Sequence, residues 1–137
     1  MFKKTLAVLA CVIGVSACQS TSETAMNDPY FGYKPPSSEA AAGIQVFHRC
    51  KKCHSMDPAR NTFGPNLRGV YMRPAASLPR FDYSDSLKAS GLVWDEANLR
   101  DWIKGNDMKV KGTRMRHVEI TDAAEQDYLI AFLKTFK

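Results

Sequence analysis

The chain has 137 residues, of which 45% are hydrophobic and 24% are charged, and its formal net charge is +5. This length leaves room for one domain of ordinary size, and the composition is typical of a soluble globular protein. A modest positive charge favours acidic partners and is too small to indicate nucleic-acid binding.

Residues 1–17 predict an export signal. Lys3 and Lys4 precede a short apolar run that ends at Val15, and this run is shorter than the roughly 20 residues that a membrane-spanning helix needs. The run leads into Val-Ser-Ala-Cys, which ends at Cys18 and resembles the lipobox of bacterial lipoproteins. That resemblance implies a lipid on Cys18 and an anchor on the periplasmic side of a membrane. Ordinary cleavage at the same bond, which would release a soluble periplasmic protein, is the alternative.

Residues 18–38 are interpreted as a lipidated N-terminus followed by a flexible tether. This stretch is polar, is interrupted by prolines and has no apolar periodicity. Twenty such residues span roughly 25 Å on average and about 70 Å when stretched. We expect Tyr30, Phe31 and Tyr33 to pack locally against the domain, which is predicted to cover residues 39–137.

The domain is predicted to be all-α, because helical patterns recur along it and no run of alternating β-branched residues is present. Long loops separate the predicted helices. Loops of this length in so small a domain indicate that they wrap a bound group. The first predicted helix is capped by Ser38 and reaches Cys50, and the second is a short one from Tyr83 to Ser90, before Gly91. The third is capped by Asp95 and ends at Gly105. The last begins at a capping box formed by Asp122 and Glu125.

The motif that carries chemistry is Cys50-Lys51-Lys52-Cys53-His54. A C-x-x-C-H sequence is the attachment site of c-type haem, in which two thiols form thioethers to the ring and the histidine is the proximal iron ligand. A zinc site is the alternative, but it needs a second Cys/His pair, which His117 alone does not supply. The sequence therefore predicts one covalent haem c.

Beyond this motif the domain resembles the class I (mitochondrial and bacterial c2-like) monohaem cytochrome c family, in a lipoprotein-anchored bacterial form. Gly43 to Phe47 matches the first family helix, in which a glycine permits close crossing by the last helix, and Phe63 to Gly69 matches the family's G-P-N-L-x-G loop. The resemblance implies a class I fold of three to five helices with long loops around the haem. The haem-contacting residues that it implies are Pro65, whose carbonyl accepts a hydrogen bond from His54, and Arg73, Tyr83, Trp94, Trp102 and Thr113.

The same resemblance implies Met115 as the sixth ligand, since Lys111 to Met115 is similar to the family's P-G-T-K-M. Met108, His117 and an open iron position are the alternatives. Two residues depart from the family pattern: Lys111 replaces a proline, and Trp102 replaces a tyrosine beside the methionine. Trp102 is equally well interpreted as a core residue on its helix.

A soft thioether opposite an imidazole favours electron transfer over catalysis. We therefore expect a monomeric, membrane-tethered electron carrier, not an enzyme, with acidic redox proteins as partners. A fixed subunit of a membrane oxidoreductase and a ligand-binding or peroxidatic haem protein are the alternatives. Basic residues around the haem edge predict the docking surface, although a merely solvated face is also possible: Lys51, Lys52, Lys104, Lys109, Lys111, Arg114 and Arg116.

Overall fold

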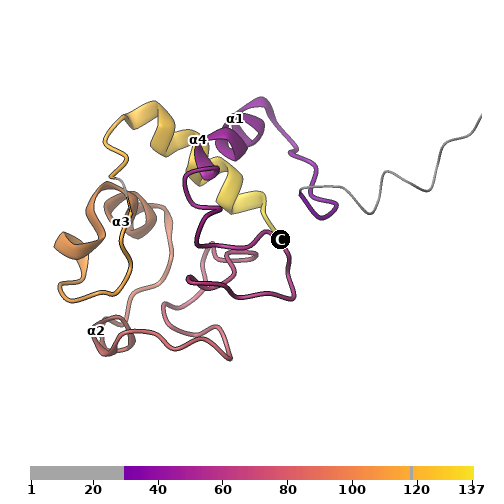
Figure 1. Ribbon diagram of the computed structural model, residues 1–137. Helices are drawn as coiled ribbons and strands as arrows, with labels where there is room; N and C mark the ends of the chain where they lie inside the picture. Colours follow the sequence, from indigo (N-terminus) through magenta and orange to yellow (C-terminus); the bar gives the residue numbers. More distant parts are fainter. Residues whose placement is uncertain (1–29, 118) are drawn as a thin grey trace, which may run out of the picture.

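The computed structural model describes residues 30–117 and 119–137 (Figure 1). The predicted signal at residues 1–17, the lipidation site Cys18 and the first part of the predicted tether lie outside the described residues. Four helices occur in the described part, in the order α1 (Ser38–Phe47), α2 (Asp85–Ala89), α3 (Glu96–Lys109) and α4 (Ala123–Thr135). No strand occurs in these residues, only an isolated bridge between Pro74 and Val93. The prediction of an all-α fold with long loops is confirmed.

The helices begin where side-chain oxygens cap free backbone amides. The carboxylate of Asp95 accepts a hydrogen bond from the amide of Asn98 at 2.8 Å, and that of Asp122 accepts one from the amide of Glu125 at 2.8 Å. Both caps are the predicted ones. The carboxylate of Glu125, however, forms a two-pronged ion pair with Arg49, at 2.6 and 2.7 Å. The second half of the predicted capping box is therefore replaced by a contact to the segment after α1.

The predicted bounds of the first helix are wrong by a few residues. Ser37, not Ser38, is the cap, since its backbone is extended and its hydroxyl accepts from the amide of Ala40. The helix ends at Phe47 because the next amides bond to carbonyls three residues back, as Cys50 does to Phe47 at 2.8 Å. The Cys50–His54 motif therefore lies in a turn that follows α1.

The predicted end of the third helix is also wrong. Gly105 has extended backbone angles (φ −176°, ψ 84°) and kinks α3, but the helix continues to Lys109. A glycine gives the chain freedom to kink without forcing it to stop.

The crossing of α1 and α4 forms the centre of the hydrophobic core. Phe47 of α1 and Phe132 of α4 are fully buried, with ring centroids 4.9 Å apart. At Gly43 an added Cβ would overlap the carbonyl of Tyr128 and lie 2.6 Å from the Cβ of Phe132. The glycine therefore permits the close approach of the two helices, as the family resemblance implies (Figure 1).

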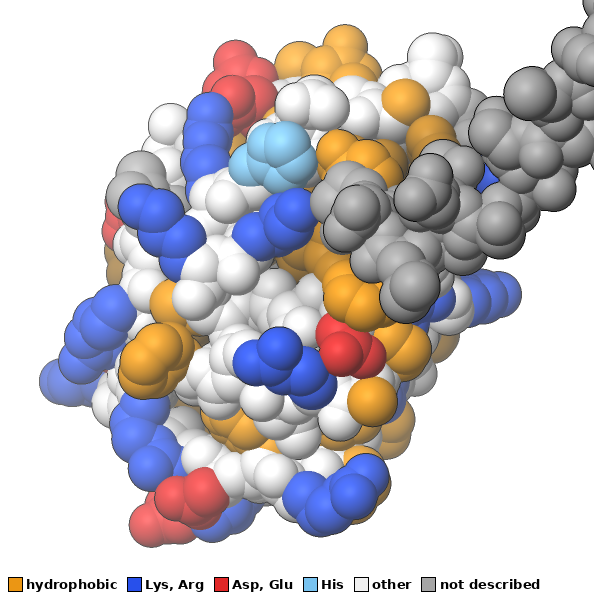
Figure 2. All heavy atoms as spheres, turned by 45° about the vertical axis from the view of Figure 1, so that its right-hand side comes forward, with side chains coloured by type: hydrophobic (Ala, Val, Ile, Leu, Met, Phe, Trp, Pro, Cys, Tyr) orange, Lys and Arg blue, Asp and Glu red, His pale blue; other side chains and the backbone are white. Residues whose placement is uncertain are grey.

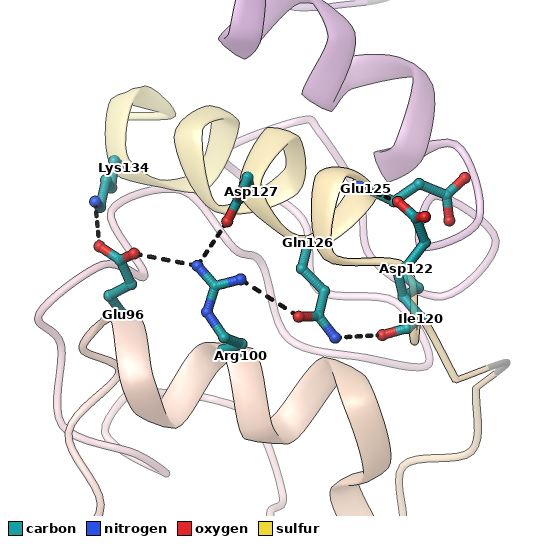
Figure 3. Close-up of polar contacts among 8 residues, drawn as sticks. All are labelled: Glu96, Arg100, Ile120, Asp122, Glu125, Gln126, Asp127 and Lys134. Atoms are coloured by element: carbon teal, nitrogen blue, oxygen red, sulfur yellow. Dashed lines mark hydrogen bonds and ion pairs between the residues drawn. The ribbon is translucent and has the colours of Figure 1, made fainter.

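Polar side chains fix α4 against α3 (Figure 3). Glu96 of α3 pairs with Lys134 of α4 at 2.6 Å and with Arg100 at 3.2 Å, and Arg100 pairs with Asp127 at 2.7 Å. Arg100 also donates to the buried amide of Gln126, which in turn donates to the carbonyl of Ile120 at 2.7 Å. This network holds the chain before α4 as well as the helix itself.

The end of the predicted tether packs on the domain. The ring of Tyr33 makes edge contacts with Phe132 and Phe136, at 5.3 and 5.5 Å between centroids, and its hydroxyl lies 2.6 Å from that of Thr135. Nearby, the guanidinium of Arg68 donates to the carbonyls of Tyr30, Phe31 and Lys137. No helix in the described ranges is long and apolar enough to cross a membrane.

Candidate cofactor site

His54 is buried and held in one orientation. Its side chain is 6% exposed, and its Nδ1 lies 2.7 Å from the carbonyl oxygen of Pro65, the contact that the sequence resemblance implies. Since a carbonyl can only accept, Nδ1 carries the proton and Nε2 keeps its lone pair. Burial lowers the pKa of His54, which favours the neutral imidazole that a metal requires. The residue is thus prepared as a ligand through Nε2.

The loop after the motif supports this orientation. An added Cβ at Gly64 would lie 2.5 to 2.9 Å from three ring atoms of His54, so only glycine fits there. The amide of Gly64 donates to the carbonyl of Cys53 at 2.7 Å, and the hydroxyl of Thr62 donates to the same oxygen. The loop is therefore closed directly onto the C-x-x-C-H turn.

Asn66 is a site residue to which sequence reasoning assigned no role. Its buried amide donates to the carbonyls of Ser55, Asp57 and Arg60 at 2.6 to 3.3 Å, and its oxygen accepts from the amide of Arg68 at 2.8 Å. One side chain thereby fixes both ends of the loop that carries Pro65. Its position directly after Gly64-Pro65 was the only available signal.

The two cysteines of the motif are free thiols, both partly buried. Burial raises the pKa of the unattached Cys50 thiol to about 11. The zinc alternative gains no support, because no group of three or more His, Cys, Asp or Glu side chains in residues 30–117 and 119–137 is arranged to hold a metal ion.

Met115 lies on a loop whose side chains and backbone are held from α3. The indole Nε1 of Trp102 donates to its sulfur at 3.1 Å, and the buried amide of Asn106 donates to its carbonyl at 2.8 Å. The buried hydroxyl of Thr113 accepts from the amide of Met115 at 3.4 Å. Sequence reasoning did not single out Asn106.

The two alternative ligands differ in their surroundings. Met108 is 78% exposed at the end of α3, and its sulfur therefore lies outside the core. His117 is partly buried, and its charge contributes to the lowered pKa of His54, which places the two rings in the same region.

Three further residues that the resemblance places in contact with the haem, Trp94, Tyr83 and Arg73, are buried or partly buried. Trp94 packs edge-on against Trp102 with 5.0 Å between centroids, and Tyr83 is buried. The guanidinium of Arg73 donates to the carbonyls of Arg68 and Asn66 at 2.9 and 3.1 Å. Tyr83 also lines a polar cleft of about 530 Å³ that runs between residues 82–86 and the pair Gly112 and Arg114.

The basic residues predicted to dock partners fall into two groups. Lys109 is paired with Asp101 at 2.8 Å, Arg114 with Asp82 at 3.1 Å, and Arg116 donates to the carbonyl of Thr113. Lys51 lies over the ring of Tyr30. The remaining three have no carboxylate within 4 Å in the described part of the chain: Lys52, Lys104 and Lys111. Figure 2 shows Lys and Arg side chains spread over one face of the molecule, with acidic side chains in few places.

Comparison with known proteins identifies the family in which this arrangement of site residues occurs. The family model described as cytochrome c matches residues 40–137, which include the whole C-x-x-C-H turn and the Met115 loop. The chain belongs to the cytochrome c family. Among its relatives, cytochrome c2 of Rhodoblastus acidophilus is 42% identical over 97 residues, covering 70% of this chain and 91% of the relative. Cytochrome c2 of Blastochloris viridis is 39% identical over 101 residues, covering 73% and 80%.

A solved structure gives the same result for the fold. Cytochrome cH from Methylobacterium extorquens matches with a TM-score of 0.66 and 42% identity, covering 70% of this chain and 97% of that one. This cytochrome is therefore a class I, c2-like member of the family, with the class I fold.

The residues present fit the cofactor of the family, one covalent haem c. The two thiols of the motif and an imidazole with its Nε2 lone pair available fit covalent attachment and proximal ligation, and the partly buried Met115 offers a thioether. When bound, haem c supplies reversible one-electron oxidation and reduction. The chain's own residues fix the imidazole, position the thioether and surround the site with apolar and aromatic side chains. The cytochrome is a haem c electron-transfer protein.

Proposed function

We propose that this cytochrome is an electron carrier on the periplasmic side of a bacterial membrane, with His54 and Met115 as the two axial ligands of its iron. The observation that carries the proposal is the pair of oriented donor atoms. The Nε2 of His54 is available because Nδ1 donates to Pro65, and the sulfur of the partly buried Met115 accepts a hydrogen bond from the indole of Trp102. With both axial positions taken by protein side chains, no position remains for a substrate, which favours electron transfer over catalysis.

The ligand assignment is tested with Met115→Ala in the holoprotein. Loss of the thioether removes the charge-transfer band of methionine-ligated ferric haem and lowers the reduction potential, because a soft ligand that favours ferrous iron is lost. Met108→Ala is the matched control, since it removes an exposed methionine. A band that survives in Met115→Ala and disappears in Met108→Ala or His117→Ala would contradict the assignment.

We also propose that a lipid on Cys18 anchors the cytochrome and that the segment from Gln19 to the packed Tyr33 acts as its tether. The lipobox-like sequence before Cys18 supports the anchor, and the packing of Tyr33 supports a tether that ends about five residues earlier than Ser38. Stable attachment to a membrane generally requires two signals, such as two acyl chains, and a diacylated cysteine supplies both chains. Cys18→Ser should shift the holoprotein from the membrane fraction to the soluble periplasm. A wild-type protein found only in the soluble fraction would refute the anchor without affecting the electron-carrier assignment.

The partners proposed for this carrier are redox proteins with acidic docking surfaces. Exposed Lys52, Lys104 and Lys111 supply positive charge and form no ion pair with a carboxylate in the described residues. Such charges increase the rate of encounter with an acidic partner and lose this effect as salt rises. Co-purification of a stoichiometric partner in detergent would indicate a fixed subunit instead of a mobile carrier.

A further inference from the structure

The most exposed large hydrophobic side chain in the described part of the molecule lies beside the cofactor turn. Phe63 is 91% exposed, and its ring is therefore almost entirely in water. A single exposed apolar residue is common on protein surfaces. Phe63 is distinguished by how firmly it is held and by what surrounds it.

The backbone on both sides of Phe63 is fixed to the haem-attachment motif. The hydroxyl of Thr62 and the amide of Gly64 both donate to the carbonyl of Cys53, and the amide of Thr62 donates to the carbonyl of Gly64 at 3.0 Å. Gly64 itself lies against the ring of His54. The phenyl ring thus projects from a closed turn one residue away from the contact with the proximal histidine. Little backbone freedom is therefore left for a partner to remove on binding.

The charged residues close to this turn are mainly basic. Asn61 donates to the carbonyl of Arg80 at 3.4 Å, which brings residue 80 beside the turn. Arg60 precedes the turn in sequence, and Lys52 precedes Cys53, whose carbonyl accepts from Thr62 and Gly64. All three cations are exposed, and none has a carboxylate within 4 Å among the described residues. The carboxylate of Asp57 is the nearest acid in sequence, and it accepts from the amide of Ala59 at 2.9 Å.

We infer that Phe63 is the apolar anchor of the surface through which this cytochrome docks an acidic redox partner. The inference rests on the proposed electron-carrier function and adds the residue that holds the complex together. The partner that fits is a redox protein whose electron-entry site is an apolar patch surrounded by carboxylates. Lys52, Arg60 and Arg80 then set the rate of encounter, whereas burial of the Phe63 ring sets the lifetime of the complex.

The test uses the holoprotein on two gold electrodes, one coated with a carboxylate-terminated alkanethiol monolayer and one with a mixed carboxylate- and methyl-terminated monolayer. The wild-type protein should bind the mixed surface about tenfold more tightly than Phe63→Ala does, because the variant has no ring to bury. On the carboxylate surface the two proteins should bind equally. Lys52→Glu should weaken binding to both surfaces, in a salt-dependent way.

Two further variants keep the result interpretable. Tyr128→Ala removes another partly exposed ring, on α4, and should leave binding to the mixed surface unchanged. Phe63→Leu keeps an apolar side chain and should restore most of the binding. Equal affinity of wild type and Phe63→Ala for the mixed surface would overturn the anchor while leaving the carrier intact. A wild-type protein that gives no reversible one-electron wave on either electrode would instead refute the proposed function.

Discussion

Replacing Trp102 by Phe tests how the protein sets the reduction potential. The indole N–H of the buried Trp102 donates to the sulfur of the partly buried Met115 at 3.1 Å, and it draws electron density from the atom proposed to bind iron. That effect weakens donation to ferric iron more than to ferrous iron, so losing the N–H should lower the potential. A net hydrogen bond contributes about 0.5 to 1.5 kcal/mol, and if this acts mainly on one oxidation state the potential falls by about 20 to 60 mV.

The assay is a spectroelectrochemical titration of the holoprotein, with Trp102→Tyr as the matched variant. A tyrosine hydroxyl can donate to the same sulfur, so Trp102→Tyr should keep the potential closer to that of the wild type. Both substitutions shorten a side chain that packs edge-on against Trp94, which controls for the loss of packing. An equal shift in both variants, or no shift in Trp102→Phe, would refute the role of the N–H donor.

The remaining predictions concern the loop and the framework. Asn106→Ala removes the hydrogen bond to the carbonyl of Met115 and so loosens the Met115 loop. The rate of imidazole binding to the ferric protein, measured by stopped flow, should rise about tenfold. An unchanged rate would contradict the role of Asn106 in holding this loop. Gly43→Ala forces a Cβ into the carbonyl of Tyr128 and should lower the free energy of unfolding by about 3 kcal/mol in denaturant titrations, near the upper end of overpacking costs. The pKa of Glu96 is lowered chiefly by its hydrogen bonds to cations, so its contribution to stability is present above the ordinary value of 4.5 and is lost as the pH falls below it. Glu96→Gln should therefore be less stable than the wild type at neutral pH and equally stable in acid.

The parts of the fold that could be predicted depend on signals close together in the sequence. The capping carboxylates of Asp95 and Asp122 act on amides three residues away, and the C-x-x-C-H turn lies within five residues. Gly43 was identified through a family resemblance, and the structure supplies its physical reason in the backbone of α4.

The parts that could not be predicted depend on which carbonyls the folded loops bring together. Asn66 and Asn106 are polar residues that belong to no periodic sequence pattern. Their roles arise because the side-chain amide of each donates to a backbone carbonyl of another segment. The same holds for the basic residues of the predicted docking surface. Lys109 and Arg114 look free in the sequence, but Asp101 and Asp82 pair with them in the structure.

The end of α3 shows why a glycine is an ambiguous signal. Gly105 was predicted to stop the helix, and it does depart from helical angles. The helix resumes because the residues after it, including the buried Asn106, have packing and hydrogen bonds that favour another turn. A glycine ends a helix only when the residues beyond it gain no packing or hydrogen bonds from a further helical turn.

Arg68 gives the domain a property that suits it to engineering. Its guanidinium donates to the carbonyls of Tyr30 and Lys137, so the segment that precedes α1 and the C-terminal residue lie within the reach of one side chain. A domain with adjacent ends can be inserted as a cassette into a surface loop of a host protein, or circularly permuted through a short linker, without stretching its framework. The electron-transfer domain could therefore be inserted into an unrelated host protein at a single surface loop.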